Sequence, residues 1–291
     1  MLISIIIPTY NRAYLLKKAL ESIFIQSYSN FEIIVIDDHS NDNTNEIINS
    51  FNDSRLKYLK NKSNGIVATS RNIGIKASKG EWIAFLDSDD WWTSNKLQSC
   101  VDNINNKVDF IYHDLVTIDK QSKRLKSRIN KSKNLKKPIL LDLLINGNPI
   151  SNSSVMVRKN ILEKVGLINE SKKLVASEDF NTWLKISKVT DQFLYLPKRL
   201  GFYLIHEENI SNKDMSLSYR AATDEFLSTL NNIQKIKLES RIRYLSGRFN
   251  YLNNDYLKAM KDLLYVIKNS KNFLMFKAMI MILLIFLKRF R

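Results

Sequence analysis

The sequence predicts an α/β fold built on a mainly parallel sheet. Short apolar runs alternate with segments of helical periodicity through the first hundred residues, which is the pattern of βαβ units. Polar clusters follow the ends of these runs, and a largely helical region forms the end of the chain. We expect strands over residues 4–7, 32–36, 56–59 and 82–86. We expect helices over residues 13–26, 43–52 and 68–78.

The polar motifs lie where the predicted strands end. The clusters at residues 9–12, 37–40 and 87–90 each follow one strand. In an open α/β sheet, the carboxyl ends of the parallel strands form the edge at which ligands bind. Cap-forming side chains in Ser40-Asn41-Asp42 and at Thr69 stand near two of the predicted helix starts.

The second half of the chain has a looser pattern. Mixed strands and helices are expected at residues 153–157, 159–165, 180–189 and 201–206. Beyond Ser216 the pattern is helical, and the spacing of Tyr251, Tyr256 and Ala259 resembles a tetratricopeptide-type hairpin. The predicted regions are residues 1–100, 101–215, 216–272 and 273–291.

Composition bounds the partners. The chain has 291 residues, 44% of them hydrophobic, and its single cysteine, Cys100, predicts a reducing environment. A net charge of +16 predicts an anionic partner. Between Lys120 and Lys137 the chain has nine basic residues and no acidic one, which indicates a mobile basic loop. Because no nucleic-acid-binding motif accompanies it, we expect anionic lipid, not nucleic acid, as its partner.

The C-terminal segment 273–287 is apolar except for Lys277, and it is followed by Lys288, Arg289 and Arg291. As a helix it would reach roughly 22 Å, which is short of the roughly 30 Å hydrocarbon core of a bilayer. The segment therefore predicts an interfacial helix with a basic end. The alternative is a terminal helix packed on the protein's own core.

The densest polar motif is Asp87-Ser88-Asp89-Asp90, which places three carboxylates within four positions. Like charges at this spacing raise one another's pKa or recruit a counter-ion. Hard divalent cations take carboxylate oxygens and often complete their shell with phosphates. The motif therefore predicts a metal and diphosphate site. The alternative is a polar turn in which Asp90 caps a helix that starts near Asn95.

Five motifs occur in order along the chain, namely Pro8-Thr9-Tyr10-Asn11-Arg12, residues 37–44, Arg71-Asn72-Ile73-Gly74, residues 86–90 and Ser177-Glu178-Asp179. In these motifs the chain closely resembles the family 2 glycosyltransferases over roughly residues 1–215. The resemblance implies a GT-A fold, which is Rossmann-like and typical of nucleotide-diphospho-sugar transferases, with a C-terminal helical appendix. It also implies inverting, metal-dependent transfer from a nucleotide sugar. Residues 1–100 would then bind the donor and residues 101–215 the acceptor.

The resemblance implies a donor site. Arg71 would face the diphosphate, unless it is a surface residue. A carboxylate can accept a hydrogen bond from N3–H of uracil, so Asp38 favours a UDP donor, with dTDP or another pyrimidine nucleotide as the alternative, unless Asp38 and Asp37 only cap a turn. The predicted donor-binding residues are Thr9, Tyr10, Asn11, Asp37, Asp38, Arg71, Asp87, Ser88 and Asp90.

The resemblance also implies metal and catalytic residues. Asp89 would bind Mn²⁺ or Mg²⁺, and His206 would complete the metal shell. Asp179 would be the general base that takes the proton of the acceptor hydroxyl, with Glu178 in support. The alternative for this pair is the cap of a helix that begins at Phe180.

These residues predict a glycosyltransferase that moves a hexose, such as glucose or galactose, from a UDP-sugar. The predicted acceptor is a lipid-diphosphate-linked saccharide of the GlcNAc-diphospho-undecaprenol type, in lipopolysaccharide O-antigen or capsule biosynthesis, and the product has a β linkage. The predicted location is peripheral, on the cytoplasmic face of the bacterial inner membrane. One alternative is a protein or soluble glycan acceptor. Another is a non-catalytic module that binds nucleic acid or membranes.

Overall fold

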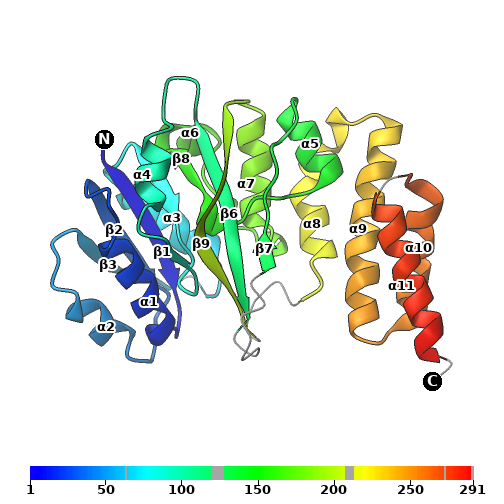
Figure 1. Cartoon of the computed structure of the whole chain (residues 1–291), viewed down its shortest axis with the longest axis horizontal. Coiled ribbons are helices and arrows are strands. Elements are labelled where there is room, and N and C mark those ends of the chain that lie inside the picture. The colour runs from blue at the N-terminus through cyan, green and yellow to red at the C-terminus, as the bar shows by residue number, and fades with distance from the viewer. Residues whose placement is uncertain (63, 120–127, 207–212, 272, 290–291) are drawn as a thin grey trace. The chain divides into compact units, whose positions relative to one another are not determined.

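The computed structural model describes residues 1–62, 64–119, 128–206, 213–271 and 273–289 (Figure 1). The chain divides into two compact units. The first unit comprises Met1–Lys136, Pro149–Glu170 and Lys185–Glu207. The second comprises Lys137–Asn148, Ser171–Leu184 and Glu208–Arg291. The four regions predicted from the sequence stay predictions, and the second unit takes two of its segments from the predicted region 101–215.

The first unit is built on one mixed sheet, with strand order β3-β2-β1-β4-β8-β6-β9-β5 and β7 paired to β6. The first four strands of this order are parallel, which confirms the predicted parallel sheet. Thr9 pairs with Asp37 at the ends of β1 and β2, so the loops that follow leave from the same edge. The strands are β1 (Ile3–Thr9), β2 (Phe31–Asp37), β3 (Leu56–Lys60), β4 (Trp82–Phe85), β5 (Trp91–Trp92), β6 (Phe110–Asp119), β7 (Arg128–Asn130), β8 (Met156–Arg158) and β9 (Phe193–Ile205).

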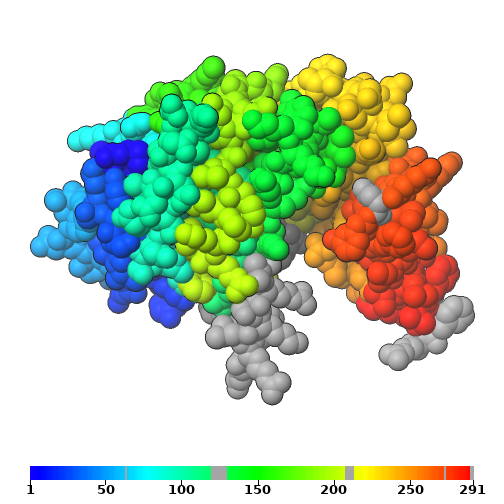
Figure 2. All heavy atoms as spheres, turned by 45° about the horizontal axis from the view of Figure 1, so that its top comes forward, coloured from blue at the N-terminus to red at the C-terminus, as the bar shows by residue number. Residues whose placement is uncertain are grey.

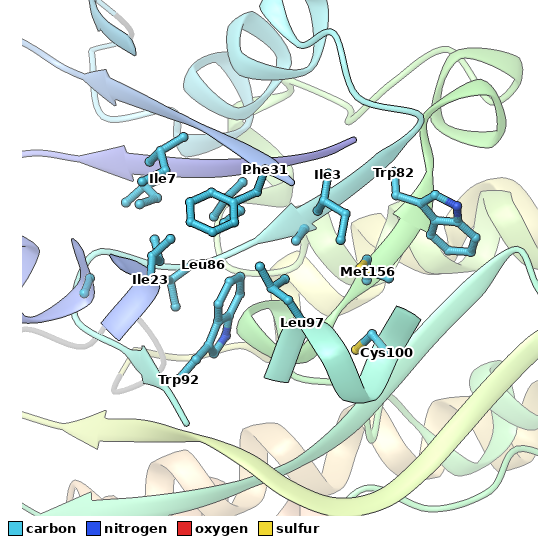
Figure 3. Close-up of a cluster of buried hydrophobic side chains, with 14 of the residues drawn as sticks. Ile3, Ile7, Ile23, Phe31, Trp82, Leu86, Trp92, Leu97, Cys100 and Met156 are labelled. Atoms are coloured by element: carbon cyan, nitrogen blue, oxygen red, sulfur yellow. The ribbon is translucent and has the colours of Figure 1, made fainter. Parts of the chain in front are cut away.

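Apolar faces of helices cover this sheet. Along α1, Leu16, Leu20 and Ile23 recur at helical spacing and are fully buried. They join side chains from β1, β2 and the segment after β4 in the main core (Figure 3). The single cysteine, Cys100, is a buried residue of this core. The helices of this unit are α1 (Ala13–Phe24), α2 (Thr44–Ser50), α3 (Val67–Ala77), α4 (Lys96–Val101), α6 (Lys159–Lys164) and the 3-10 turn η1 (Asn152–Ser154).

Of the predicted cap-forming side chains, Asp42 bonds to two helix starts without being the N-cap residue of either helix, and Thr69 is no cap. The Asp42 carboxylate accepts hydrogen bonds from N–H of Ala13 at 2.9 Å and of Thr44 at 3.1 Å, so one side chain serves the first turns of α1 and α2. Thr69 lies inside α3, and its hydroxyl donates to Glu170 at 2.8 Å. It is no cap because α3 begins two residues earlier.

Helix α3 lies unusually close to the sheet because of Gly74. A Cβ atom on this residue would come within 2.7 Å of Ile6 and 2.8 Å of Ile36, which lie on β1 and β2. Glycine is therefore required for this close approach. Arg71, one turn earlier on α3, is held toward the carboxyl edge of the sheet as a result.

His113 and Asp114 are two adjacent buried polar residues. Both lie on β6 inside the first unit, with 0% and 5% of their surfaces exposed. Asp114 accepts hydrogen bonds from Ser132 N–H at 2.8 Å and Tyr195 OH at 2.8 Å. Burial lowers the pKa of His113 to about 3, so this imidazole is neutral inside the fold.

The second unit is helical. Helices α9 and α10 form the hairpin expected around Tyr251 and Tyr256, whose ring centroids lie 6.3 Å apart, and Ala259 is buried in it. The Asp255 side chain accepts from Lys258 N–H and so caps α10. The elements are α5 (Ile139–Asn146), η2 (Lys172–Leu174), α7 (Glu178–Ser187), α8 (Ser216–Thr223), η4 (Asp224–Thr229), α9 (Asn232–Leu252), α10 (Tyr256–Asn269) and α11 (Phe273–Arg289).

Helix α11 is apolar on two faces. Ala278, Met281 and Ile285 are buried in the cluster that α11 forms with α10, so the predicted alternative of packing on the protein itself holds for this face. The other face is exposed, and Figure 2 shows α11 atoms at the surface. Its exposed apolar residues are Phe273, Phe276, Met279, Ile280, Leu283, Leu284, Phe286 and Leu287.

Two further predictions concern membrane contact. Among the described helices, none has the length and hydropathy needed to span a membrane. The predicted basic loop 120–137 includes residues 120–127, which lie outside the described part of the chain. Of the remainder, Arg128–Asn130 form β7.

Candidate active site

The loops after β1 and β2 are joined into one scaffold. Asp38 N–H donates to the Thr9 carbonyl at 2.9 Å, and Asn11 N–H donates to Ser40 Oγ at 2.8 Å. In return, Asn41 N–H donates to Asn11 Oδ1 at 2.7 Å. Asn11 takes a left-handed conformation, with φ of 49°, which asparagine tolerates well. The Thr9–Asn11 segment is therefore held rigidly at the carboxyl edge of the sheet.

The two carboxylates after β2 have different environments. Asp37 is 1% exposed and accepts from the backbone and hydroxyl of Ser40 and from Tyr58 OH at 2.6 Å. Asp37 therefore makes the contacts expected of the predicted alternative, in which its carboxylate caps a turn. Asp38 is half-buried and accepts from Gly65 N–H at 3.0 Å. Asp38 and the exposed Tyr10 and Asn11 are thus more accessible than Thr9 and Asp37, which are buried.

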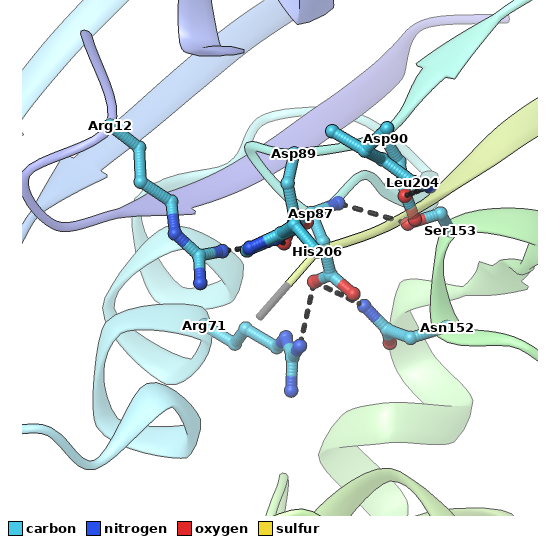
Figure 4. A network of polar contacts seen from close by, with 9 residues as sticks. All are labelled: Arg12, Arg71, Asp87, Asp89, Asp90, Asn152, Ser153, Leu204 and His206. Atoms are coloured by element: carbon cyan, nitrogen blue, oxygen red, sulfur yellow. Dashed lines mark hydrogen bonds and ion pairs between the residues drawn. The ribbon is translucent and has the colours of Figure 1, made fainter. Parts of the chain in front are cut away.

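Arg71 is a buried residue, so the predicted alternative of a surface role is wrong. It is 5% exposed, and its Nη2 lies 2.7 Å from Asp87 Oδ1. The same carboxylate oxygen accepts from Asn152 Nδ2 at 3.0 Å, while Asp87 N–H donates to Ser153 Oγ at 3.0 Å. Asp87 is thereby fixed between α3 and η1 (Figure 4).

Asp89 and His206, the two predicted metal ligands, lie in contact. His206 Nε2, at the end of β9, lies 2.9 Å from Asp89 Oδ2. The same oxygen also lies 2.6 Å from Arg12 Nη1 (Figure 4). The Asp89 side chain is 10% exposed, so the protein encloses most of this carboxylate. A carboxylate oxygen, an imidazole nitrogen and a guanidinium converge at one point of the sheet edge.

Asp90 is the most buried carboxylate of the acidic turn. It is 2% exposed, and its Oδ1 accepts from Leu204 N–H at 3.2 Å, two residues before His206. Burial, followed by the charges of Asp89 and Asp87, raises the pKa of Asp90 well above its usual value. Its neighbour Ser88 is buried as well. The hydrogen bond from Leu204 N–H to Asp90 links the acidic turn to β9. The predicted cap of the helix near Asn95 is wrong because that helix, α4, has no side-chain cap.

The donor set fits a divalent cation that shares its shell with a substrate. Within residues 1–62, 64–119, 128–206, 213–271 and 273–289, no three His, Cys, Asp or Glu side chains gather as a ready-made metal cluster. Asp89 and His206 nevertheless offer oxygen and nitrogen ligands 2.9 Å apart. Two protein ligands completed by phosphate oxygens is the arrangement in which Mg²⁺ or Mn²⁺ commonly binds nucleotides.

Glu178 and Asp179 belong to the second unit. They are the first two residues of α7, which begins two positions earlier than predicted, so the helix does not start at Phe180. Glu178 is 6% exposed, and the half-buried Asp179 accepts from Phe180 N–H at 2.6 Å. A helix N-terminus favours negative charge, so both carboxylates lie where the helix dipole is favourable to them. Their roles toward a sugar acceptor stay predictions.

Three side chains in this network were missed as site residues by sequence reasoning. Arg12 is the last residue of the motif Pro8-Thr9-Tyr10-Asn11-Arg12, and this motif is the sequence signal that points to it. Asn152 and Ser153 lie more than 60 residues from the acidic turn in the sequence, within an unremarkable run of small polar residues. No local sequence pattern predicts their hydrogen bonds to Asp87.

Comparison with known proteins identifies the family. The protein-family model described as glycosyl transferase family 2 matches residues 4–166, which is more than half of the chain. The chain belongs to glycosyl transferase family 2. The matched segment contains Arg12, Arg71 and the whole acidic turn.

Curated relatives of this family 2 chain extend the likeness beyond the matched segment. An uncharacterized glycosyltransferase of Rickettsia felis is 31% identical over 280 residues, which is 89% of this chain and 44% of the relative. The chain thus spans less than half the length of that relative. A second relative is the Escherichia coli protein UDP-Glc:alpha-D-GlcNAc-diphosphoundecaprenol beta-1,3-glucosyltransferase WfgD. It is 32% identical over 188 residues, which is 64% of this chain and 70% of the relative.

Solved structures support the fold of this family 2 member. Staphylococcus aureus TarS 1-349 in complex with UDP-GlcNAc has a TM-score of 0.67, covering 92% of this chain and 81% of that one. At 21% sequence identity, the likeness shows the fold alone. The predicted GT-A fold with C-terminal helices is therefore confirmed.

Proposed function

We propose that this chain transfers a hexose from a UDP-sugar to a lipid-diphosphate-linked saccharide, in lipopolysaccharide O-antigen or capsule biosynthesis. The observation that carries the proposal is the Arg71–Asp87 and Asp89–His206 network at the carboxyl edge of the parallel strands. It combines a fork of hydrogen-bond donors with metal-ligand types. A nucleoside diphosphate with a divalent cation is the ligand chemistry that matches both.

The donor would lie across the joined loops after β1 and β2. Asp38 would accept the hydrogen bond of uracil N3–H, while Thr9, Tyr10 and Asn11 form the nucleoside cradle. Asp37 would act by holding the Ser40 turn, since its oxygens already accept bonds from Ser40 and Tyr58. Arg71 would neutralise the diphosphate while Asp87 keeps its guanidinium oriented.

Asp89 and His206 would hold the cation, with Mn²⁺ the better match for an imidazole ligand and Mg²⁺ the alternative. When bound, the cation supplies positive charge beside the departing diphosphate. Asp90 and Ser88 would keep the turn in place through their burial. The bond from Leu204 N–H to Asp90 would fix the end of β9, which carries His206.

Asp179 would act as the general base. It would take the proton from the acceptor hydroxyl as that oxygen bonds to the anomeric carbon and the bond to the UDP oxygen breaks, leaving UDP with the electron pair. Attack from the side opposite UDP inverts the configuration, so an α-linked UDP-sugar would give a β linkage. Glu178, buried beside it, would support its orientation.

The acceptor part of the proposal is supported by likeness to the Escherichia coli protein, whose name states a GlcNAc-diphospho-undecaprenol acceptor. The test is UDP release from a panel of UDP-hexoses with Mn²⁺ and a synthetic lipid-diphosphate-GlcNAc. We expect one donor to give acceptor-dependent release that EDTA abolishes and added Mn²⁺ restores. Reactions without acceptor are the control. Absence of acceptor-dependent release with every UDP-hexose would contradict the proposal.

We also propose that α11 places the protein on the cytoplasmic face of the inner membrane. Its exposed face presents large apolar side chains, among them Phe276, Ile280 and Leu283, on a continuous helical stripe. The exposed Lys277 and Lys288 lie on the same helix. Apolar side chains beside basic ones match an anionic lipid surface, where the chains enter the acyl boundary and the ammonium groups meet the headgroups.

The double variant Ile280→Asp/Leu283→Asp is expected to bind vesicles of phosphatidylglycerol at least tenfold more weakly than the wild type. Each buried Ile or Leu contributes about 1.5–3 kcal/mol, so two losses exceed the 1.4 kcal/mol of a tenfold change. Vesicle flotation measures the effect. The matched control is Leu257→Asp, because Leu257 is 75% exposed on α10. Equal binding by wild type and double variant would contradict a lipid-facing α11.

A further inference from the structure

Arg12 is the basic side chain that meets the predicted metal ligand in this structure. Its Nη1 lies 2.6 Å from Asp89 Oδ2, and His206 Nε2 lies 2.9 Å from the same atom. Two donors therefore converge on one carboxylate oxygen. A cation that takes this oxygen as a ligand has to displace at least one of them.

The backbone of Arg12 is fixed on both sides. Before it, Asn11 is bonded to Ser40 and Asn41. After it, Ala13 N–H donates to Asp42, and the Arg12 carbonyl accepts from Leu16 N–H at 2.8 Å in the first turn of α1. The side chain itself is 23% exposed, so it borders solvent while its backbone stays anchored. A long side chain on a fixed base can exchange one anionic partner for another.

The charges around the acidic turn give Arg12 a distinct task. Asp87 is paired with Arg71, and Asp90 is buried and accepts from Leu204 N–H. Asp89 is paired with Arg12, which has no second ion pair among the described residues. Arg12 therefore supplies the positive charge that Asp89 needs when no metal ion is bound.

We infer that Arg12 is a resident counter-cation of Asp89, which yields this carboxylate to the metal ion and then binds the diphosphate of the nucleotide. The inference rests on the proposed function. A metal ion alone has to displace the guanidinium without offering it a new partner. A metal ion that arrives with a diphosphate brings oxygens for the guanidinium fork. Arg12 thus couples metal binding to donor binding, and by linkage the coupling is the same in both directions.

The test compares Mn²⁺ binding by the full chain with and without UDP, measured by electron paramagnetic resonance of free Mn²⁺. In the wild type, UDP is expected to tighten Mn²⁺ binding more than tenfold. In Arg12→Ala, Mn²⁺ alone is expected to bind about tenfold more tightly than to the wild type, because no guanidinium competes for Asp89. UDP is then expected to add less than a threefold gain.

Two further variants define the cause. Arg12→Gln keeps a hydrogen-bond donor without the charge, and it is expected to behave as Arg12→Ala does. It also protects the test against a fold defect, which thermal melting of both variants would reveal. Arg55→Ala is the matched control, because Arg55 forms its ion pair with Asp53 at 2.7 Å in the same unit. It is expected to bind Mn²⁺ and UDP as the wild type does.

The outcomes separate this inference from the proposed function. If folded Arg12→Ala and Arg12→Gln bind Mn²⁺ no more tightly than the wild type, Arg12 is not the counter-cation and the inference is overturned. The proposed function then still stands, because the wild type binds Mn²⁺ with UDP. If the wild type binds no Mn²⁺ in the presence of UDP, the metal site fails and the inference fails with it.

Discussion

Asp179→Asn is expected to lower the rate of sugar transfer about 10²- to 10⁴-fold, which is the usual contribution of a positioned general base. The amide has nearly the shape of the carboxylate, so the first turn of α7 and the bond from Phe180 N–H should persist. It cannot take the acceptor proton, because an amide nitrogen is not a base at neutral pH. Single-turnover transfer with a saturating UDP-sugar, Mn²⁺ and lipid acceptor measures the chemical step.

The same variant should bind UDP and Mn²⁺ within twofold of the wild type, because Asp179 has no proposed part in donor binding. The matched control is Glu178→Gln, which makes the same chemical change at the neighbouring carboxylate. A supporting residue should lose far less activity than the base. If Asp179→Asn kept more than a tenth of the wild-type rate, Asp179 would not be the general base. If Glu178→Gln then lost more activity than Asp179→Asn, Glu178 would be the base instead.

The fold of the first unit could be predicted from the sequence because its signals are local. Residues 5–7 and 33–36 are continuously apolar, as is typical of strands buried on both faces. Their ends then place the motifs, since parallel strands share one edge. Helix boundaries are less certain because capping is decided by tertiary contacts. Asp42 reaches Ala13, 29 residues earlier in the chain, and Thr69 is used by Glu170 instead.

The site shows the same division between local and distant information. Asp89 and His206 were predicted together because the family resemblance implies that both bind the metal ion, and they lie in contact. The burial of Asp37 and Asp90 could not be read from the sequence, because neighbouring carboxylates look alike until the fold gives one a Tyr58 hydroxyl and another a Leu204 N–H. Sequence distance hides such partners. Asn152 could not be predicted as a partner of Asp87 because the two residues are 65 positions apart in the sequence.

Asp89→Ala is expected to abolish measurable Mn²⁺ binding in the presence of UDP and to reduce transfer at least 10³-fold. His206 alone is a weak site for a hard cation, and the other carboxylates nearby already have partners, with Asp87 bound to Arg71 and Asn152. Loss of the bound cation removes the positive charge that stabilises the departing UDP. Free Mn²⁺ and UDP release measure the two effects on the same protein.

The matched control is Asp53→Ala, which removes a carboxylate and an Arg55 ion pair from the same unit without touching the acidic turn. Asp89→Asn refines the result, because it keeps an oxygen that can accept from Arg12 and His206 while losing the charge. If charge is what the cation needs, Asp89→Asn will fail to bind Mn²⁺ as completely as Asp89→Ala. Retention of Mn²⁺ binding by both variants would move the metal to Asp87, whose oxygen would then have to be released by Arg71 before any donor could bind.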